Sequence, residues 1–113
     1  MDYNGLLNLG AELGCRLMKS GAEIFRVEDS IKRLMQAYGA PDAQVFAIPN
    51  CLIVGITPPE GHPITRITRI PAHGTDMDLL EYCNALCRQL CSQRPPLDQA
   101  QQMVLDLDRT NPT

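Results

Sequence analysis

The chain has 113 residues, of which 44% are hydrophobic and only 4% aromatic, so it can form one domain with an aliphatic core and without disulfide support. A formal net charge of -3, a pI near 5.2 and dispersed basic residues argue against a nucleic-acid-binding protein. The sequence also contains no basic amphipathic helix of the kind that binds a membrane surface.

Three features predict the cellular location of the chain. The N-terminus has no basic start before its apolar residues, so it does not resemble a signal peptide. The longest apolar stretch, residues 45–56, is too short to cross a bilayer and is interrupted by Pro49 and Asn50. Five cysteines without disulfide-like spacing are typical of a reducing compartment. We therefore expect the chain itself to be soluble and cytosolic.

A first helix is predicted for residues 3–19. Gly10 and Gly14 are four residues apart and therefore lie on one side of this helix, where they would admit a close neighbour. The apolar stripe that defines the helix is formed by Leu6, Leu9, Leu13 and Leu17.

The segment SGAEIFRVEDSIKRLMQAYGAP, residues 20–41, has the clearest helix pattern in the sequence. Ser20 and Glu23 have the spacing of a capping box, in which each side chain accepts a hydrogen bond from a free backbone N–H group. Gly39 and Pro41 are expected to end the helix. Its buried stripe is predicted to be Ile24, Val27, Ile31, Leu34, Met35 and Tyr38.

The charged residues of this second helix fall on different sides. At about 100° per residue, Glu28 lies at the edge of the apolar stripe, beside Met35. Arg26 and Arg33 lie on the opposite side, which we expect to be solvated. Glu28 is therefore the acidic residue of this helix that is expected to reach inward.

Three short β-rich segments follow, at residues 43–48, 51–57 and 64–70. Pro49 and Asn50 indicate a hairpin turn between the first two, and the sequence PPEGHP indicates a second tight turn. The three segments therefore predict an antiparallel meander.

The third segment has the unusual sequence PITRITRIP, residues 63–71. Five of the seven residues between the prolines are β-branched, which favours a strand. Alternation puts Arg66 on one face of the sheet and Arg69 on the other, so one arginine is expected to face the helices that cover the sheet. The Arg66 set is Ile64, Arg66, Thr68 and Ile70, and the Arg69 set is Thr65, Ile67 and Arg69.

Two further helices complete the chain. Thr75 is expected to cap a third helix that has acidic residues in its first turn and ends near Arg94. A last helix is predicted for residues 97–108. The order helix-helix, three strands, helix-helix predicts an α+β fold in which the helices pack on one sheet face and the other face is open to water, a ligand or a partner.

The sequence offers few residues for catalysis or metal binding. Cys83, Cys87 and Cys91 step by four along one helix face, which is typical of small core residues rather than of a zinc site, and we expect no metal and no cofactor. His62 and His73 lie in predicted loops, and no known catalytic motif accompanies them.

Glu28, Arg66 and Arg69 are the remaining candidates, and two interpretations stay open. In the structural interpretation, Glu28 forms a buried or half-buried ion pair with the inward-facing arginine of the third strand. In the functional interpretation, an arginine on the open face, helped by Thr65 or Thr68, binds a carboxylate from a small molecule or another protein.

The segment GCRLMKSGAEIFRVEDSIKRLMQAYGA, followed by ITRITRIP and a pair of helices, resembles the N-terminal domain of the threonine/serine exporter family over residues 6–108. The resemblance implies a domain on the cytoplasmic face of the inner membrane, and a complete protein that exports threonine and serine or, in related systems, dicarboxylates such as succinate. The residues that match the family pattern are Ser20, Gly21, Glu23, Arg26, Glu28, Thr65, Arg66 and Arg69.

The resemblance implies a single domain, residues 1–113, that regulates, couples or assembles an exporter. No membrane span follows Asp108, so the expected partner is a membrane-spanning half of the same protein or of a companion subunit. A second copy of the chain and a small polar metabolite are further expected partners. Nucleic acid is not an expected partner. Two alternatives are a solute-sensing module and a small hydrolase, in which Glu28 or His73 is the base and Arg66 or Arg69 holds an oxyanion.

Overall fold

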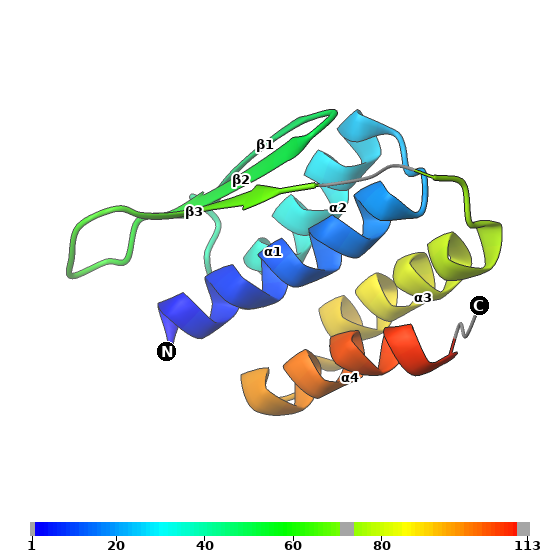
Figure 1. Cartoon of the computed structure of the whole chain (residues 1–113). Helices are drawn as coiled ribbons and strands as arrows, with labels where there is room; N and C mark the ends of the chain where they lie inside the picture. The colour runs from blue at the N-terminus through cyan, green and yellow to red at the C-terminus, as the bar shows by residue number, and fades with distance from the viewer. Residues whose placement is uncertain (1, 71–73, 111–113) are drawn as a thin grey trace.

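The computed structural model describes residues 2–70 and 74–110 and contains four helices and a three-stranded sheet within these ranges (Figure 1). The element order is the predicted one, and the α+β fold is confirmed. The elements are α1 (Tyr3–Lys19), α2 (Ile24–Ala37), β1 (Gln44–Ile48), β2 (Cys51–Ile56), β3 (Ile64–Arg69), α3 (Met77–Gln93) and α4 (Leu97–Thr110).

The elements form three layers (Figure 1). The sheet is the first layer, and α1 and α2 cover one of its faces, with α2 against β1 and α1 against β2 and β3. The third layer is made by α3 and α4, which pack on α1, while α3 also contacts α2. The helices therefore all lie on one side of the sheet, as predicted, but only the first two helices touch it.

The sheet is an antiparallel meander in the order β1-β2-β3. Leu52 of β2 is paired with Ala47 of β1 and with Thr68 of β3, and these three residues point toward the helices. The neighbouring residue Ile53 is paired with Phe46 and Ile67, which point the other way. The predicted alternation of β3 is thus confirmed, with Arg66 on the helix-covered face and Arg69 on the open face.

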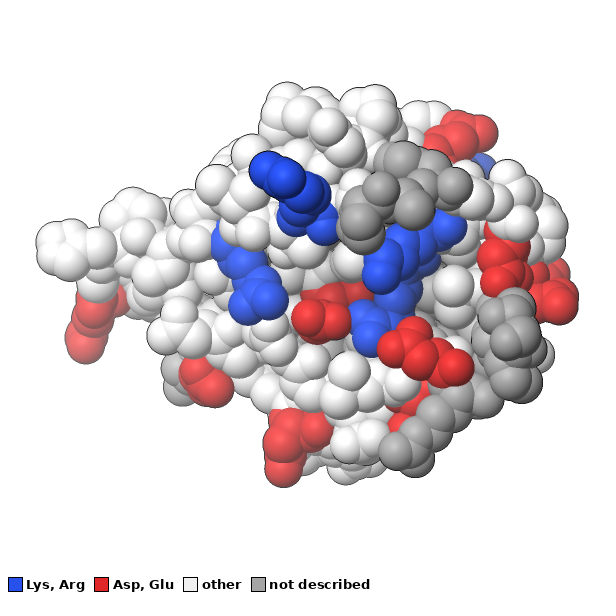
Figure 2. Space-filling view, viewed as in Figure 1, with Lys and Arg blue, Asp and Glu red and all other residues white. Residues whose placement is uncertain are grey.

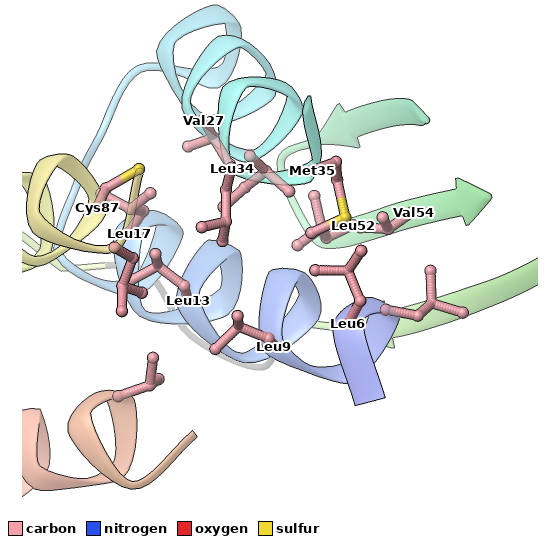
Figure 3. Close-up of a cluster of buried hydrophobic side chains, with 14 of the residues drawn as sticks. Leu6, Leu9, Leu13, Leu17, Val27, Leu34, Met35, Leu52, Val54 and Cys87 are labelled. Carbon is pink, nitrogen blue, oxygen red and sulfur yellow. The ribbon is translucent and has the colours of Figure 1, made fainter. Parts of the chain in front are cut away.

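The core lies between the sheet and the helix layers, and its side chains are almost entirely aliphatic (Figure 3). Gly10 and Gly14 of α1 form part of this packing, because Ile31 of α2 lies directly over them. A Cβ atom on Gly14 would lie 2.5 Å from Leu52 Cδ2 and 3.3 Å from Ile31 Cγ1. The two glycines therefore allow α1 to approach both α2 and β2 closely, which the sequence predicted in outline.

The predicted capping box at Ser20 and Glu23 is wrong. Ser20 ends α1 instead: it is fully buried, and its hydroxyl donates to the Leu17 carbonyl at 2.8 Å. Gly21 follows with a φ of 96°, and the N–H groups of Gly21 and Ala22 donate to Met18 and Leu17, which is a glycine-based helix C-terminus. Because this turn separates the two helices, α2 begins only at Ile24, and its N-cap residue Glu23 makes no side-chain capping bond.

The other helix ends agree more closely with the predictions. Gly39, with a φ of 91°, directly follows the C-cap of α2, as expected. The N-cap of α3 is Asp76 rather than Thr75, because the Asp76 side chain accepts a hydrogen bond from the Leu79 N–H at 3.0 Å. Arg94 ends α3 in a left-handed conformation.

Candidate functional site

The two faces of the sheet differ in what covers them. On the helix-covered face, Leu52, Val54 and Ile56 of β2 are buried. On the opposite face, Phe46 is 55% exposed and Ile67 is 69% exposed. Nothing among the described residues covers this second face, which we call the open face. Its residues are Gln44, Phe46, Ile48, Cys51, Ile53, Gly55, Thr65, Ile67 and Arg69.

The strand register arranges the open face in three rows. The middle row contains only large apolar side chains, those of Phe46, Ile53 and Ile67. One neighbouring row holds Ile48 and Arg69 on either side of Cys51, and the other row holds the smaller residues. Next to the middle row lies a shallow hollow of about 340 Å³, whose lining includes Phe46 and Ile53. The open face is therefore an apolar surface with a cationic group at one corner.

Arg69 and Arg66 occupy different environments on β3. Arg69 is exposed on the open face and forms no ion pair among the described residues. The Arg66 side chain starts on the covered face but remains 44% exposed, and its guanidinium lies 4.0 Å from the Glu12 carboxylate of α1. At this exposure the contact contributes little stability. Neither arginine is thus locked into the core.

The predicted ion pair between Glu28 and an arginine of β3 is wrong for the described residues. The Glu28 carboxylate instead accepts a hydrogen bond from the Ala47 N–H of β1 at 2.9 Å. The reason is topological: α2 packs over β1, whereas α1 packs over β3, and β2 lies between the two outer strands. The carboxylate near Arg66 accordingly comes from α1. Glu28 covers a backbone N–H group that an edge strand would otherwise expose.

The threonines of β3 are divided in the same way. Thr65 is exposed on the open face. Thr68 lies on the covered face, and its buried Oγ1 atom has no hydrogen-bond partner among the described residues. A ligand on the open face could therefore contact Thr65 and Arg69 but not Thr68. One combination of the hydrolase hypothesis, Glu28 beside an arginine of β3, is not formed, because Glu28 bonds β1 at one edge of the sheet and the arginines belong to β3 at the other edge. The other combination uses His73, which lies outside the described residues.

Arg16 makes two ion pairs among the described residues, and the sequence interpretation missed it. Its side chain is only 11% exposed, and it bonds Asp108 of α4 through two nitrogen atoms, at 3.2 and 2.8 Å. A third contact of 2.7 Å joins it to Glu12. Figure 2, which has the same viewpoint as Figure 1, shows acidic and basic side chains alternating near the centre of the visible surface. The Glu12 contact has the i,i+4 spacing of a helix, but nothing in the sequence pointed to Asp108.

The protonation of Arg16 follows from these contacts. Burial alone would lower the pKa of Arg16, but hydrogen bonds to Asp108 and Glu12 outweigh burial and raise it. The guanidinium therefore stays charged and joins α1 to α4. This is the role that the sequence interpretation had given to Glu28 and an arginine of β3.

Two of the three cysteines of α3 are buried core residues, as predicted, whereas Cys91 is partly buried. Cys83 and Cys87 are buried, and burial raises the pKa of each thiol to about 12. Within residues 2–70 and 74–110, no three His, Cys, Asp or Glu side chains are grouped closely enough to hold a metal ion. His62 is exposed in the turn between β2 and β3, and His73 lies outside the described residues.

The comparisons with known proteins identify a transporter family. Residues 8–113 match the family model ThrE, the threonine/serine exporter family. No curated protein and no solved structure is significantly similar to the chain. In the part of the chain that the structure describes, no helix combines the length and the apolar character needed to cross a bilayer. Since the family model covers nearly the whole sequence, the chain belongs to the threonine/serine exporter family.

Proposed function

We propose that this domain assembles a threonine/serine exporter on the cytoplasmic side of the membrane, and that its open face docks on the membrane-spanning part of the exporter. Family membership supports the link to export. The observation that carries the docking role is the apolar middle row of the open face, Phe46, Ile53 and Ile67.

An apolar row of this kind is not needed by the isolated fold. The same strands already bury Leu52, Val54 and Ile56 on their other face, and two helices seal that face. Apolar side chains that gather on an exposed surface indicate a binding partner. Three of the large hydrophobic residues that are exposed in the described chain, Phe46, Ile48 and Ile67, lie on this one face.

The chemistry of the open face also defines the partner. Phe46, Ile53 and Ile67 require an apolar surface, such as the side of a helix that emerges from the membrane. Arg69, at the corner of the face, would pair with a carboxylate or with the carbonyl groups that end such a helix. A second copy of this chain offers an apolar face but also repeats the positive charge. The membrane-spanning part of the exporter is therefore the occupant that we propose.

The test is the recovery of the tagged chain with membranes of cells that contain the exporter. We expect Ile67→Asp to reduce membrane recovery at least tenfold and to lower threonine export, because a carboxylate would be buried in an apolar contact. Met77→Asp is the matched control, since Met77 is 63% exposed at the start of α3, far from the open face. The control should leave recovery and export unchanged.

Two outcomes would contradict the proposal. Equal recovery of the wild-type chain and Ile67→Asp would mean that the open face does not hold the partner. A wild-type chain that forms dimers in solution, with dimerisation lost in Ile67→Asp and membrane recovery retained, would assign the face to a second copy instead. Circular dichroism of both variants checks that the fold is intact.

A further inference from the structure

A groove of about 860 Å³ lies between α2 and α3, on a part of the molecule that the proposed docking role does not use. Arg26 and Arg33 of α2 and Arg88 of α3 line it, together with one acidic residue, Asp29. The remaining lining residues are Phe25, Ser30, Asn84, Cys87, Cys91 and Ser92. A smaller hollow of about 250 Å³, which also contains Arg26, Ser30 and Asn84, continues the groove toward the turn between α1 and α2.

The charge of this groove is unusual for the chain. The protein as a whole is acidic, with a formal net charge of -3, yet three guanidinium groups and a single carboxylate line this groove. The smaller hollow beside it adds one carboxylate, that of Glu23. Asp29 is already paired with Arg33, at 3.0 Å. The side chains of Arg26 and Arg88 have no ion-pair or hydrogen-bond partner among the described residues. The groove therefore keeps two uncompensated positive charges, one on each helix.

The neutral polar side chains between the arginines also lack hydrogen-bond partners among the described residues. The side chains of Ser30 and Asn84 are partly buried, and neither makes a hydrogen bond within the described part of the chain. The Ser30 carbonyl accepts a weak bond from the Cys87 thiol at 3.5 Å, which holds the two helices together at the floor of the groove. The groove thus combines free hydrogen-bond donors with a floor of fixed geometry.

The fold gains little from these arginines. Arg33 and Asp29 are 72% and 61% exposed, and ion pairs at such exposure contribute only about 0–1 kcal/mol. Within residues 2–70 and 74–110, Arg26 and Arg88 make no ion pair, and placing like charges on facing helices opposes their packing. Since structural stability does not account for the three arginines, binding of an anion is the better explanation.

We propose that the groove between α2 and α3 binds an anion with two or more acidic groups, carboxylate or phosphate, held between Arg26 and Arg88 and oriented by Asn84 and Ser30. Guanidinium groups bind both kinds of acid through paired N–H donors. A zwitterionic amino acid fits poorly, because its ammonium group would meet the same positive charges. The ligand would therefore be an effector of the exporter rather than threonine or serine.

Calorimetry on the purified chain tests this site with pyrophosphate and citrate as soluble probes, and with threonine as the zwitterionic probe. We expect binding of pyrophosphate or citrate and no heat with threonine. Arg26→Gln and Arg88→Gln should each weaken binding at least tenfold. Arg69→Gln is the matched control, because Arg69 is an exposed, unpaired arginine outside the groove, and its affinity should stay within twofold of the wild type.

A second arm identifies the source of the acidic group. Flotation with cardiolipin-containing vesicles, compared with phosphatidylcholine vesicles, would reveal binding to a lipid headgroup with two phosphates that depends on Arg26 and Arg88. Loss of binding in these two variants, in either arm, supports the site. Absence of binding to the soluble probes and to both vesicles would overturn it, as would an equal loss of affinity in Arg69→Gln. Arg26→Gln and Arg88→Gln do not alter the open face, so failure here leaves the docking proposal intact.

Discussion

The two faces of the three-stranded sheet are built from similar residues but have different surroundings. One face turns Leu52 and Val54 into the core, where α1 and α2 cover them. The other turns Phe46 and Ile67 outward, where nothing in the described chain covers them. The comparison shows that hydrophobic content alone does not distinguish a core from a docking surface. What distinguishes them is whether other elements of the same chain pack against the face.

The largest difference between the faces should appear on truncation of one side chain from each. Leu52→Ala removes a buried side chain in contact with α1, and we expect it to lower the free energy of unfolding by about 2–5 kcal/mol. Ile67→Ala, on the open face, should change it by less than about 0.5 kcal/mol. Urea unfolding followed by circular dichroism measures both values. A large loss in Ile67→Ala would show that the open face is part of the core.

The close approach of α1 to the covered face can be tested at Gly14. Gly14→Val would place a branched side chain against Leu52 and Ile31, and overpacking of this kind costs about 1–3 kcal/mol. The measurement is again the free energy of unfolding in urea. Gly39→Ala is a poor control because of its positive φ, so Gly61→Ala in the exposed turn serves instead and should be nearly neutral. Unchanged stability in Gly14→Val would contradict the observed packing.

A smaller difference in stability is expected between two arginine variants, one at the contact between α1 and α4 and one on the open face. Arg16→Gln removes a charged hydrogen-bonding group from the contact between α1 and α4, and we expect a loss of about 1–2 kcal/mol. Arg69→Gln on the open face should cost almost nothing. Thermal unfolding of both variants gives the comparison. Equal losses would mean that Arg16 does not tie the helix layers together.

The last difference is a pH dependence that arises in the helix layers. Burial raises the pKa of the Cys83 and Cys87 thiols from 9.0 to about 12, so above pH 9 the unfolded chain loses these protons before the folded chain does. The thiols therefore contribute their full stability below pH 9, and this stability is lost as the pH rises toward 12. Urea midpoints between pH 8 and 11 should fall, and a Cys83→Ala/Cys87→Ala variant should show a flatter decline.

The sequence predicted the elements well because their signals are local. Apolar spacing identified the helices, and alternation sorted Arg66 and Arg69 onto different faces of the sheet. The capping box failed because Ser20 and Glu23 have the right spacing, but Gly21 takes a left-handed conformation that ends α1 first. Periodicity within one segment cannot show which of two nearby breaks in a helix pattern is used.

The candidate site was less predictable because it depends on how distant segments pack. The Glu28 pair required α2 to lie over β3, and only the fold shows that α1 lies there. The Arg16 and Asp108 contact joins residues 92 positions apart. Arg26 and Arg33 of α2 looked like an ordinary solvated helix face until α3, which carries Arg88, was placed beside them.

The most direct measurement of the central claim uses Cys51, a native thiol on the open face, next to the apolar middle row. Its alkylation rate is measured by mass spectrometry in the isolated chain and in membranes that contain the assembled exporter, with Cys15, outside the sheet, as the internal reference. If the open face docks on the membrane-spanning part, Cys51 should react at least tenfold more slowly in the membranes while Cys15 changes little. An equal Cys51 rate in both samples would contradict the account.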